Sequence, residues 1–218
     1  MGTSSVDQSQ ESDLPSAARR NLLKIGVAYA GVGALAPLRS LAIQPPSATA
    51  VKIFNVLEYG AAGDGKTLDS AAIQRAVDAA ASHGGKAQVL VPGGHKYLVG
   101  TIELKGGIDF HLADGAELLI STRREDYRGG LAGSVSGATM ANAAGGVIIA
   151  DQAHGLTISG TGSLQGRAKE FMARYDEATE ISIPGPFRPK MFVLTGCREL
   201  TVRDITFSEA PNWGLHLL

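Results

Sequence analysis

The sequence predicts an all-β protein in which short strands stack in coils, with one α-helix near the N-terminal end of the stack. Its 218 residues include 28 glycines but only 6% aromatic residues, a composition that indicates many tight turns. Beyond residue 86, apolar residues alternate with polar ones in short segments that end near glycine, as β-strands do. The segment before them has the spacing of an amphipathic helix.

The first 50 residues are interpreted as an export signal followed by a linker. Arg19 and Arg20 precede an apolar stretch over 25–38, an arrangement similar to a twin-arginine signal peptide. This stretch is shorter than the ~20 residues of a membrane span. Small residues ending near Ala42 or Ala50 suit a signal peptidase. We therefore expect a mature protein without a membrane span in the periplasm or outside the cell; a short amphipathic or buried helix is the alternative.

The remaining residues, 51–218, are expected to form one domain. The whole chain is 44% hydrophobic and 19% charged, which suits a globular core. Its formal net charge is −1 and no basic patch stands out, so nucleic acid is not an expected partner. Cys197 is the single cysteine, which excludes an internal disulfide, and it has no Cys/His neighbourhood for structural zinc. We expect no metal and no cofactor.

A strand and then a helix open this domain. Alternating apolar residues predict a strand over 51–58. Asp69 or Ser70 can cap a helix that runs through Ser82, where glycines end it. One face of this helix carries the small apolar residues Ile73, Ala76, Val77 and Ala80. Such a narrow stripe suits packing on a flat surface, such as the open end of a stack of strands.

Short strands follow the helix and are separated by turns that contain glycine. The alternation predicts strands over 87–91, 97–104, 108–112 and 117–120. Two stretches, 128–146 and 167–189, are rich in small residues or proline and interrupt the pattern. We expect both to leave the stack as loops.

Two later segments repeat one pattern and indicate a solenoid. Residues 148–160 align with residues 192–204 at an offset of 44, which we interpret as two coils of about 22 residues. Residues 156–158 are then expected to stack in register on 200–202, with the threonines facing outward.

One motif favours a different class of protein. Residues 60–67 match the phosphate-loop pattern G-x-x-x-x-G-K-[ST] and lie between a predicted strand and a helix. In a phosphate loop, the Lys and Thr lie on the first turn of the helix. Here the predicted helix cap lies beyond Lys66 and Thr67, and one helix is too few to cover both faces of a parallel sheet. Nucleotide binding is kept as a remote alternative.

The order of motifs along the chain resembles glycoside hydrolase family 28 and the related pectate-lyase-like β-helices. Residues 54–67 and 71–77 resemble the opening of that family, in which Gly-Asp-Gly precedes a capping helix. The likeness continues through 91–98, 112–118, 158–166 and 208–216. The resemblance implies a right-handed parallel β-helix with an N-terminal capping α-helix, and an inverting hydrolase of galacturonan-type pectic chains. The expected partner is then an acidic plant polysaccharide, and the alternatives are a non-catalytic carbohydrate-binding β-helix and a pectate-lyase-like polysaccharide lyase.

The family's catalytic motifs are not in this sequence. Inversion needs one carboxylic acid and one carboxylate base, which the family supplies from Asn-Thr-Asp and a paired Asp-Asp. Neither occurs here, nor do Gly-His-Gly and Arg-Ile-Lys. We therefore assign no catalytic residue and expect the sequence to be the N-terminal part of such a domain, inactive as given. Trp213 and His216, in a segment similar to the family's Ser-Pro-x-Trp coil, are the candidate substrate-binding residues.

The last residues, 213–218, form an apolar strand without a polar closing segment. The final coil of a solenoid presents unpaired backbone groups unless something covers it. We therefore expect self-association through this open coil.

Overall fold

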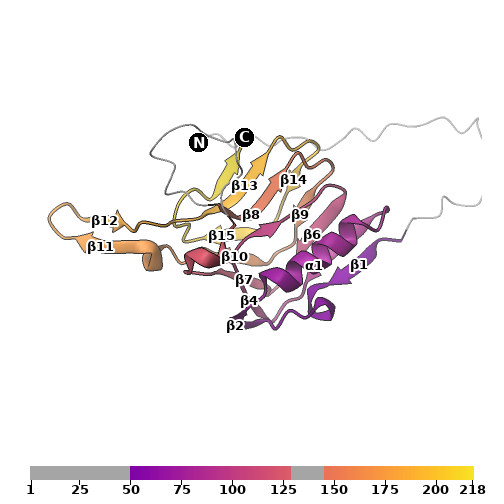
Figure 1. Cartoon of the computed structure of the whole chain (residues 1–218), viewed down its shortest axis with the longest axis horizontal. Helices are drawn as coiled ribbons and strands as arrows, with labels where there is room; N and C mark the ends of the chain where they lie inside the picture. Colours follow the sequence, from indigo (N-terminus) through magenta and orange to yellow (C-terminus); the bar gives the residue numbers. More distant parts are fainter. Residues whose placement is uncertain (1–49, 129–144) are drawn as a thin grey trace, which may run out of the picture. The chain divides into compact units, whose positions relative to one another are not determined.

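The strands form three parallel sheets, each of which collects one strand from successive coils (Figure 1). The computed structural model describes residues 50–128 and 145–218, all within one unit, Ser47–Leu218. Arg19, Arg20 and most of the predicted loop over 128–146 lie outside the described residues. The predicted fold class, a parallel β-helix with one helix, is confirmed.

Three lists give the strands in the order in which they pair. Sheet A contains β1 (Lys52–Asn55), β3 (Ala87–Val91), β6 (Ile108–Leu112), β9 (Thr157–Ser159) and β14 (Thr201–Val202). Sheet B contains β2 (Asp64–Leu68), β4 (Lys96–Val99), β7 (Glu117–Ile120), β10 (Ser163–Gln165) and β15 (Thr206–Ser208). Sheet C contains β5 (Ile102–Glu103), β8 (Gly146–Asp151), β13 (Lys190–Thr195) and β16 (Leu215–Leu217).

The predicted helix is α1 (Ser70–Ala81), with Asp69 and Ser82 at its cap positions. It follows β2 and contacts β5, so in the first coil it takes the place that a strand of sheet C takes later. Figure 1 shows it beside β1 and β6, which it also contacts. The four residues of the predicted apolar face are all buried, as expected: Ile73, Ala76, Val77 and Ala80. The helix therefore covers the first coils, and its alanines permit a close approach.

Two predicted strands are shorter than expected because each contains a corner. The strand predicted over 51–58 ends at Asn55, whose side chain accepts a hydrogen bond from the Leu57 N–H at 3.0 Å. A 3-10 turn, η1 (Val56–Tyr59), follows it. The strand predicted over 97–104 is divided into β4 and β5, which belong to different sheets.

Asp69 stabilises the turn before the helix rather than the helix itself. Its carboxylate makes no hydrogen bond to an N–H of α1. Instead it accepts from the backbone N–H groups of Ala62 and Gly63, at 2.6 and 3.1 Å, and the residue is 1% exposed. Asp69 thus fixes the glycine-rich turn against the start of the helix.

The Asp69→Asn variant is expected to lose about 2 kcal/mol of unfolding free energy. The amide cannot accept from both N–H groups as the carboxylate does, and a hydrogen bond to a charged group contributes about 1.5–3 kcal/mol. Urea denaturation followed by circular dichroism measures the loss. Asp114→Asn is the control, because Asp114 is exposed and its only side-chain hydrogen bond is a long one, 3.3 Å to Thr161. Equal midpoints for the two variants would contradict this role of Asp69.

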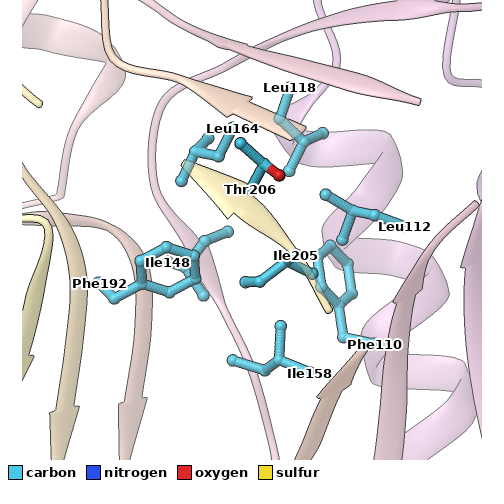
Figure 2. Close-up of a pocket in the computed structure, with 9 residues that line it drawn as sticks. All are labelled: Phe110, Leu112, Leu118, Ile148, Ile158, Leu164, Phe192, Ile205 and Thr206. Atoms are coloured by element: carbon cyan, nitrogen blue, oxygen red, sulfur yellow. The ribbon is translucent and has the colours of Figure 1, made fainter. Parts of the chain in front are cut away.

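Inward-facing side chains from all three sheets form one continuous core. Figure 2 shows where they converge beneath β15, around a small cavity of about 10 Å³. The lining residues come from sheets A, B and C and from the turn before β15: Phe110, Leu112, Leu118, Ile148, Ile158, Leu164, Phe192, Ile205 and Thr206. This volume could hold at most one water, and its nearly apolar lining offers few hydrogen-bond partners. The cavity is a packing defect of the interior and not a ligand site.

The internal repeat has the predicted register, but its 44 residues span one coil and not two. Thr157 pairs with Thr201, 44 residues later, and Ile158 pairs with Val202. The two strands are direct neighbours, so an offset of 44 residues is one coil, and the interpretation as two coils is wrong. The extra length lies between β10 and β13, where the chain leaves the stack and returns.

The corners between sheets differ sharply in length. Those from sheet A to sheet B are short: 92–95, 113–116, 160–162 and 203–205. Those from sheet C to sheet A are also short: 104–107, 152–156 and 196–200. Four links run from sheet B to sheet C: 100–101, 121–145, 166–189 and 209–214. Two of them are long, and in 121–145 the structure describes only 121–128 and 145.

The excursion over 166–189 confirms the predicted loop and adds a hairpin. Its strands β11 (Met172–Asp176) and β12 (Ile181–Pro184) pair antiparallel and extend away from the coils (Figure 1). At its base, Phe187 packs against Tyr127 and Phe171, with ring centroids 5.0 and 5.9 Å apart. Tyr127 belongs to the link between β7 and β8. These aromatic contacts therefore join that link to the base of the hairpin.

Candidate functional site

The outer face of sheet C carries the residues that the sequence singled out. Along β13 and β8, Phe192 and Ile148 pair in register and both lie in the core. Val193 and His216 pair in register one position further along, so both face outward. The outer face of sheet C therefore has His216 on its last strand.

Lys190 shares this outer face with His216. The consecutive residues Met191 and Phe192 both lie in the core, so the strict alternation of β13 is interrupted there. This places Lys190 and Val193 on the same side of the strand. Lys190 Nζ lies 2.8 Å from His216 Nδ1, and each residue is 8% exposed. A lysine and a histidine are thus paired in a largely covered position.

Trp213 completes the cluster, which we call the sheet C cluster: Lys190, Trp213 and His216. The indole centroid is 4.4 Å from that of the His216 ring, edge to face at 81°, and 5.3 Å from Lys190 Nζ. The indole remains 52% exposed. A cation beside the face of an indole is attracted by the ring quadrupole. The cluster thus offers solvent an aromatic surface next to a buried positive charge.

Backbone and side-chain hydrogen bonds hold the Trp213 segment in place. The Met191 N–H donates to the Trp213 carbonyl at 3.0 Å, which continues the ladder between β13 and β16. The Arg188 guanidinium donates to the Pro211 carbonyl at 3.1 Å, and the Asn212 side chain donates to the Arg188 carbonyl at 3.3 Å. The end of the hairpin excursion therefore positions the indole.

Burial lowers the pKa of both nitrogens, and the charge of Lys190 also acts on His216. Burial lowers the pKa of the Lys190 ammonium below its ordinary value. Burial and, second, the positive charge of Lys190 lower the pKa of His216. At neutral pH the imidazole is then neutral and its Nδ1 accepts a hydrogen bond from the ammonium. The arrangement can bind an anionic group, and the indole can contact the apolar face of a sugar ring.

The sequence predicted two of the three residues of this cluster. Trp213 and His216 are brought together, 4.4 Å between ring centroids. Lys190 was missed, because it directly follows the predicted loop over 167–189 and a charged residue at such a boundary is normally solvated. The available signal was its place directly before the buried strand residues 191–194.

The phosphate-loop motif does not form a phosphate site. Lys66 and Thr67 lie on strand β2, before the helix. Asp64 accepts hydrogen bonds from the N–H groups of both residues, at 2.8 and 2.7 Å, and these bonds lower the pKa of Asp64 to about 2. The N–H groups of Ala62 and Gly63 are already bonded to Asp69. Residues 60–67 therefore lack the phosphate-loop arrangement on which the nucleotide-binding alternative rested.

The other acidic residues and the histidine at turns lie apart from the cluster. Asp114 and Asp204 lie at corners between sheets A and B, and Asp151 ends β8. His154 Nε2 is 3.6 Å from Glu199, at the corner from sheet C to sheet A. Within residues 50–128 and 145–218, no group of three or more His, Cys, Asp and Glu side chains could hold a metal ion. The same residues contain no helix that is long and apolar enough to cross a membrane.

Comparison with known proteins identifies relatives of this arrangement. Residues 53–118 match the family model described as rhamnogalacturonase A/epimerase, pectate lyase-like. An exo-poly-α-D-galacturonosidase of Dickeya chrysanthemi is 40% identical over 76 residues, which are 35% of this chain and 12% of that protein. The match therefore spans a small part of that relative.

Solved structures share the fold over most of this chain. A putative glycosyl hydrolase of Parabacteroides merdae matches with a TM-score of 0.60 and 26% identity, over 76% of this chain and 69% of the other. A family 28 exopolygalacturonase of Yersinia enterocolitica matches with a TM-score of 0.60 and 22% identity, over 77% of this chain and 37% of the other.

The sheets, the capping helix and the structural matches define the class: a right-handed parallel β-helix. Within that class, residues 53–118 match the pectate lyase-like family model, and part of the chain is similar to an exo-poly-α-D-galacturonosidase.

Proposed function

We propose that this chain is the substrate-binding part of a polygalacturonase-like glycoside hydrolase that acts on galacturonan-type pectic polysaccharide. The observation that carries the proposal is the sheet C cluster, in which the exposed indole of Trp213 lies beside the paired nitrogens of Lys190 and His216. A galacturonan chain presents a carboxylate on every sugar ring, which suits a buried positive charge next to an aromatic surface. The relatedness to an exo-poly-α-D-galacturonosidase supports the same substrate class.

The proposal assigns Trp213 and His216 to substrate binding and no residue to catalysis. Inverting hydrolysis requires an acid and a base on opposite sides of the sugar, and the sequence lacks the paired aspartates that the family uses. A polypeptide of these 218 residues is therefore expected to bind oligogalacturonate without cleaving it.

One incubation separates this function from its alternatives. Polygalacturonate is mixed with the 218-residue chain, and reducing ends, ultraviolet absorbance and retention on the polymer are measured. Retention on galacturonan without retention on neutral galactan supports the proposal. Reducing ends without absorbance would show a complete hydrolase, and absorbance from an unsaturated product would show a lyase. Absence of retention on any uronate polymer would overturn the proposed substrate class.

The Trp213→Ala variant is expected to bind trigalacturonate about tenfold more weakly. An aromatic contact contributes about 0.5–1.5 kcal/mol beyond its buried area, and about 1.4 kcal/mol corresponds to tenfold in affinity. Isothermal titration calorimetry measures the change. The matched control is Tyr175→Ala on β11, which removes another exposed aromatic side chain outside the cluster, 58% exposed against 52% for Trp213. Equal affinities for the two variants would remove Trp213 from the site.

We also propose export by the twin-arginine machinery, to the periplasm or the outside of the cell. The motif around Arg19 and Arg20 supports it. The Arg19→Lys, Arg20→Lys double variant should then remain in the cytoplasm of an expressing bacterium, as judged by fractionation. Export of this variant at the normal level would argue against that route.

Self-association is proposed for the 218-residue polypeptide on the basis of its last strands. The inward-facing Leu215 and Leu217 are 41% and 58% exposed, and Phe207 on β15 is 40% exposed. Burial of such apolar surface and pairing of an open sheet edge both favour association. Sedimentation velocity should show dimers or larger species at micromolar concentration. A monomer throughout that range would contradict the proposal.

A further inference from the structure

We propose that Lys190 and His216 form a carboxylate-binding pair that takes up a proton when a uronate binds. Lys190 is then the residue that selects charged sugars over neutral ones, and His216 adjusts the charge of the pair to the ligand. This inference rests on the proposed function, because it names the chemistry of the same site. It adds a specificity residue and a link between substrate binding and pH.

The distance between the two nitrogens limits their charge. Lys190 Nζ and His216 Nδ1 are 2.8 Å apart, which is a hydrogen-bond distance and leaves room for one proton between them. In the free protein the pair therefore carries one positive charge, with Nζ donating and Nδ1 accepting. The proton of the neutral imidazole is then on Nε2.

The charge of the pair has no partner among the described residues. No carboxylate oxygen described in the structure lies within 4.0 Å of Lys190 Nζ, although the residue is only 8% exposed. Lys190 is the only charged residue of β13. On β8, Asp151 lies at the far end of the sheet, opposite Thr195.

The segment that precedes β16 does not neutralise this charge either. Glu209 is exposed at a turn, and the Arg188 guanidinium, which donates to the Pro211 carbonyl, adds a second positive charge to the region. A covered cation without a counterion is costly unless a ligand supplies one. A carboxylate ligand would therefore bind where the protein provides none.

A bound carboxylate changes the protonation that the pair prefers. A carboxylate that accepts a hydrogen bond from Nζ and another from the protonated Nδ1 takes the place of the direct bond between the two nitrogens. Its negative charge offsets the burial and the repulsion that disfavour the imidazolium, so the imidazolium becomes favourable. The pKa of His216, which burial and Lys190 lower in the free protein, rises in the complex. Affinity must then increase as pH falls from the pKa of the complex toward that of the free protein. It decreases again near pH ~3.5, where the uronate itself becomes protonated.

The test is calorimetric titration of the 218-residue protein with trigalacturonate at pH 6, in two buffers with different ionisation enthalpies. We expect uptake of a fraction of a proton per bound ligand and affinity about fivefold higher at pH 5 than at pH 7. The His216→Gln variant, whose side-chain oxygen can still accept from Lys190, should bind with no proton uptake and an affinity independent of pH over that range. The Lys190→Met variant should bind trigalacturonate at least about tenfold more weakly. It should also lose the preference for trigalacturonate over neutral galactotriose.

A second measurement does not depend on ligand binding. In the free protein, NMR titration of the imidazole should show a higher pKa for His216 in the Lys190→Met variant than in the parent, since the positive neighbour is gone. Circular dichroism spectra equal to that of the parent establish that each variant is folded.

The outcomes distinguish this inference from the proposed function. Trigalacturonate binding without proton uptake would overturn the inference and leave the proposed substrate class intact. Absence of binding to any uronate would overturn both. An unchanged His216 pKa in Lys190→Met would overturn the coupling, whatever the substrate is.

Discussion

The Phe110→Ala variant is expected to be the most destabilised of the core variants, with a loss of about 3–5 kcal/mol in unfolding free energy. Phe110 is 0% exposed on β6, the middle strand of sheet A, and its ring lines the cavity in Figure 2. Truncation would join the vacated ring volume to that cavity of about 10 Å³, and coils stacked on both sides limit collapse into it. Urea denaturation monitored by circular dichroism measures the loss.

The Phe207→Ala variant is the matched control for this prediction. It removes the same side chain from β15, where 40% of the residue is exposed, so less contact area is lost. We expect it to cost less than half as much as Phe110→Ala. A similar loss for both variants would show that burial within the stack does not determine their contributions.

The Gly160→Ala variant is expected to lose at least about 3 kcal/mol, or to fail to fold. Gly160 is at the corner between β9 and β10 with a φ of +101°, and an added Cβ would lie 1.9 Å from the Leu112 carbonyl oxygen. The side chain would separate two coils whose backbones touch at this corner. Left-handed strain of about 1 kcal/mol comes in addition.

The Gly107→Ala variant separates the backbone strain from the steric collision. Gly107 has a φ of +75°, but no atom lies within 4 Å of the position its Cβ would take. This variant carries the backbone strain without the collision, so about 1 kcal/mol is expected. Thermal unfolding of both proteins gives the comparison, and equal losses would rule out the collision with Leu112.

The periodicity of apolar residues predicted the helix and the strands whose bounds depend on neighbouring residues in the sequence. The helix ends within one residue of its expected bounds because one apolar stripe and two following glycines indicate the same bounds, although Asp69 does not cap it through its side chain. The strands Ala87–Val91 and Ile108–Leu112 match their predicted ranges for a similar reason, since alternation and turn residues agree.

The number of coils could not be predicted in the same way. The repeat at an offset of 44 residues fixes which strands pair, but not how the intervening residues are used. An inserted hairpin and a second coil have similar lengths, and both contain alternating residues. The antiparallel pairing of β11 with β12 lies inside the segment that was predicted as a loop because of its prolines. The sequence pattern therefore did not indicate this hairpin.

The candidate site could be predicted only in part, because one of its residues comes from a different coil. Trp213 and His216 were found through their resemblance to a family motif, whereas Lys190 comes from the coil before them. Its closeness to His216 depends on the interruption of alternation at Met191 and Phe192, which both lie in the core. To predict a contact between neighbouring coils, one must know the register in which their strands pair.

The excursion over 166–189 leaves the stack between sheet B and sheet C, where β4 and β5 are joined by residues 100–101 alone. Insertions there lengthen the chain without shifting any ladder register, so this corner can vary freely between relatives while the coils remain constant. Under the proposed function, substrate preference can then change through the inserted hairpin while the strands of sheet C stay the same. A chimera that carries the hairpin segment of another β-helix between β10 and β13 should therefore fold like the parent and differ in which polysaccharide it retains.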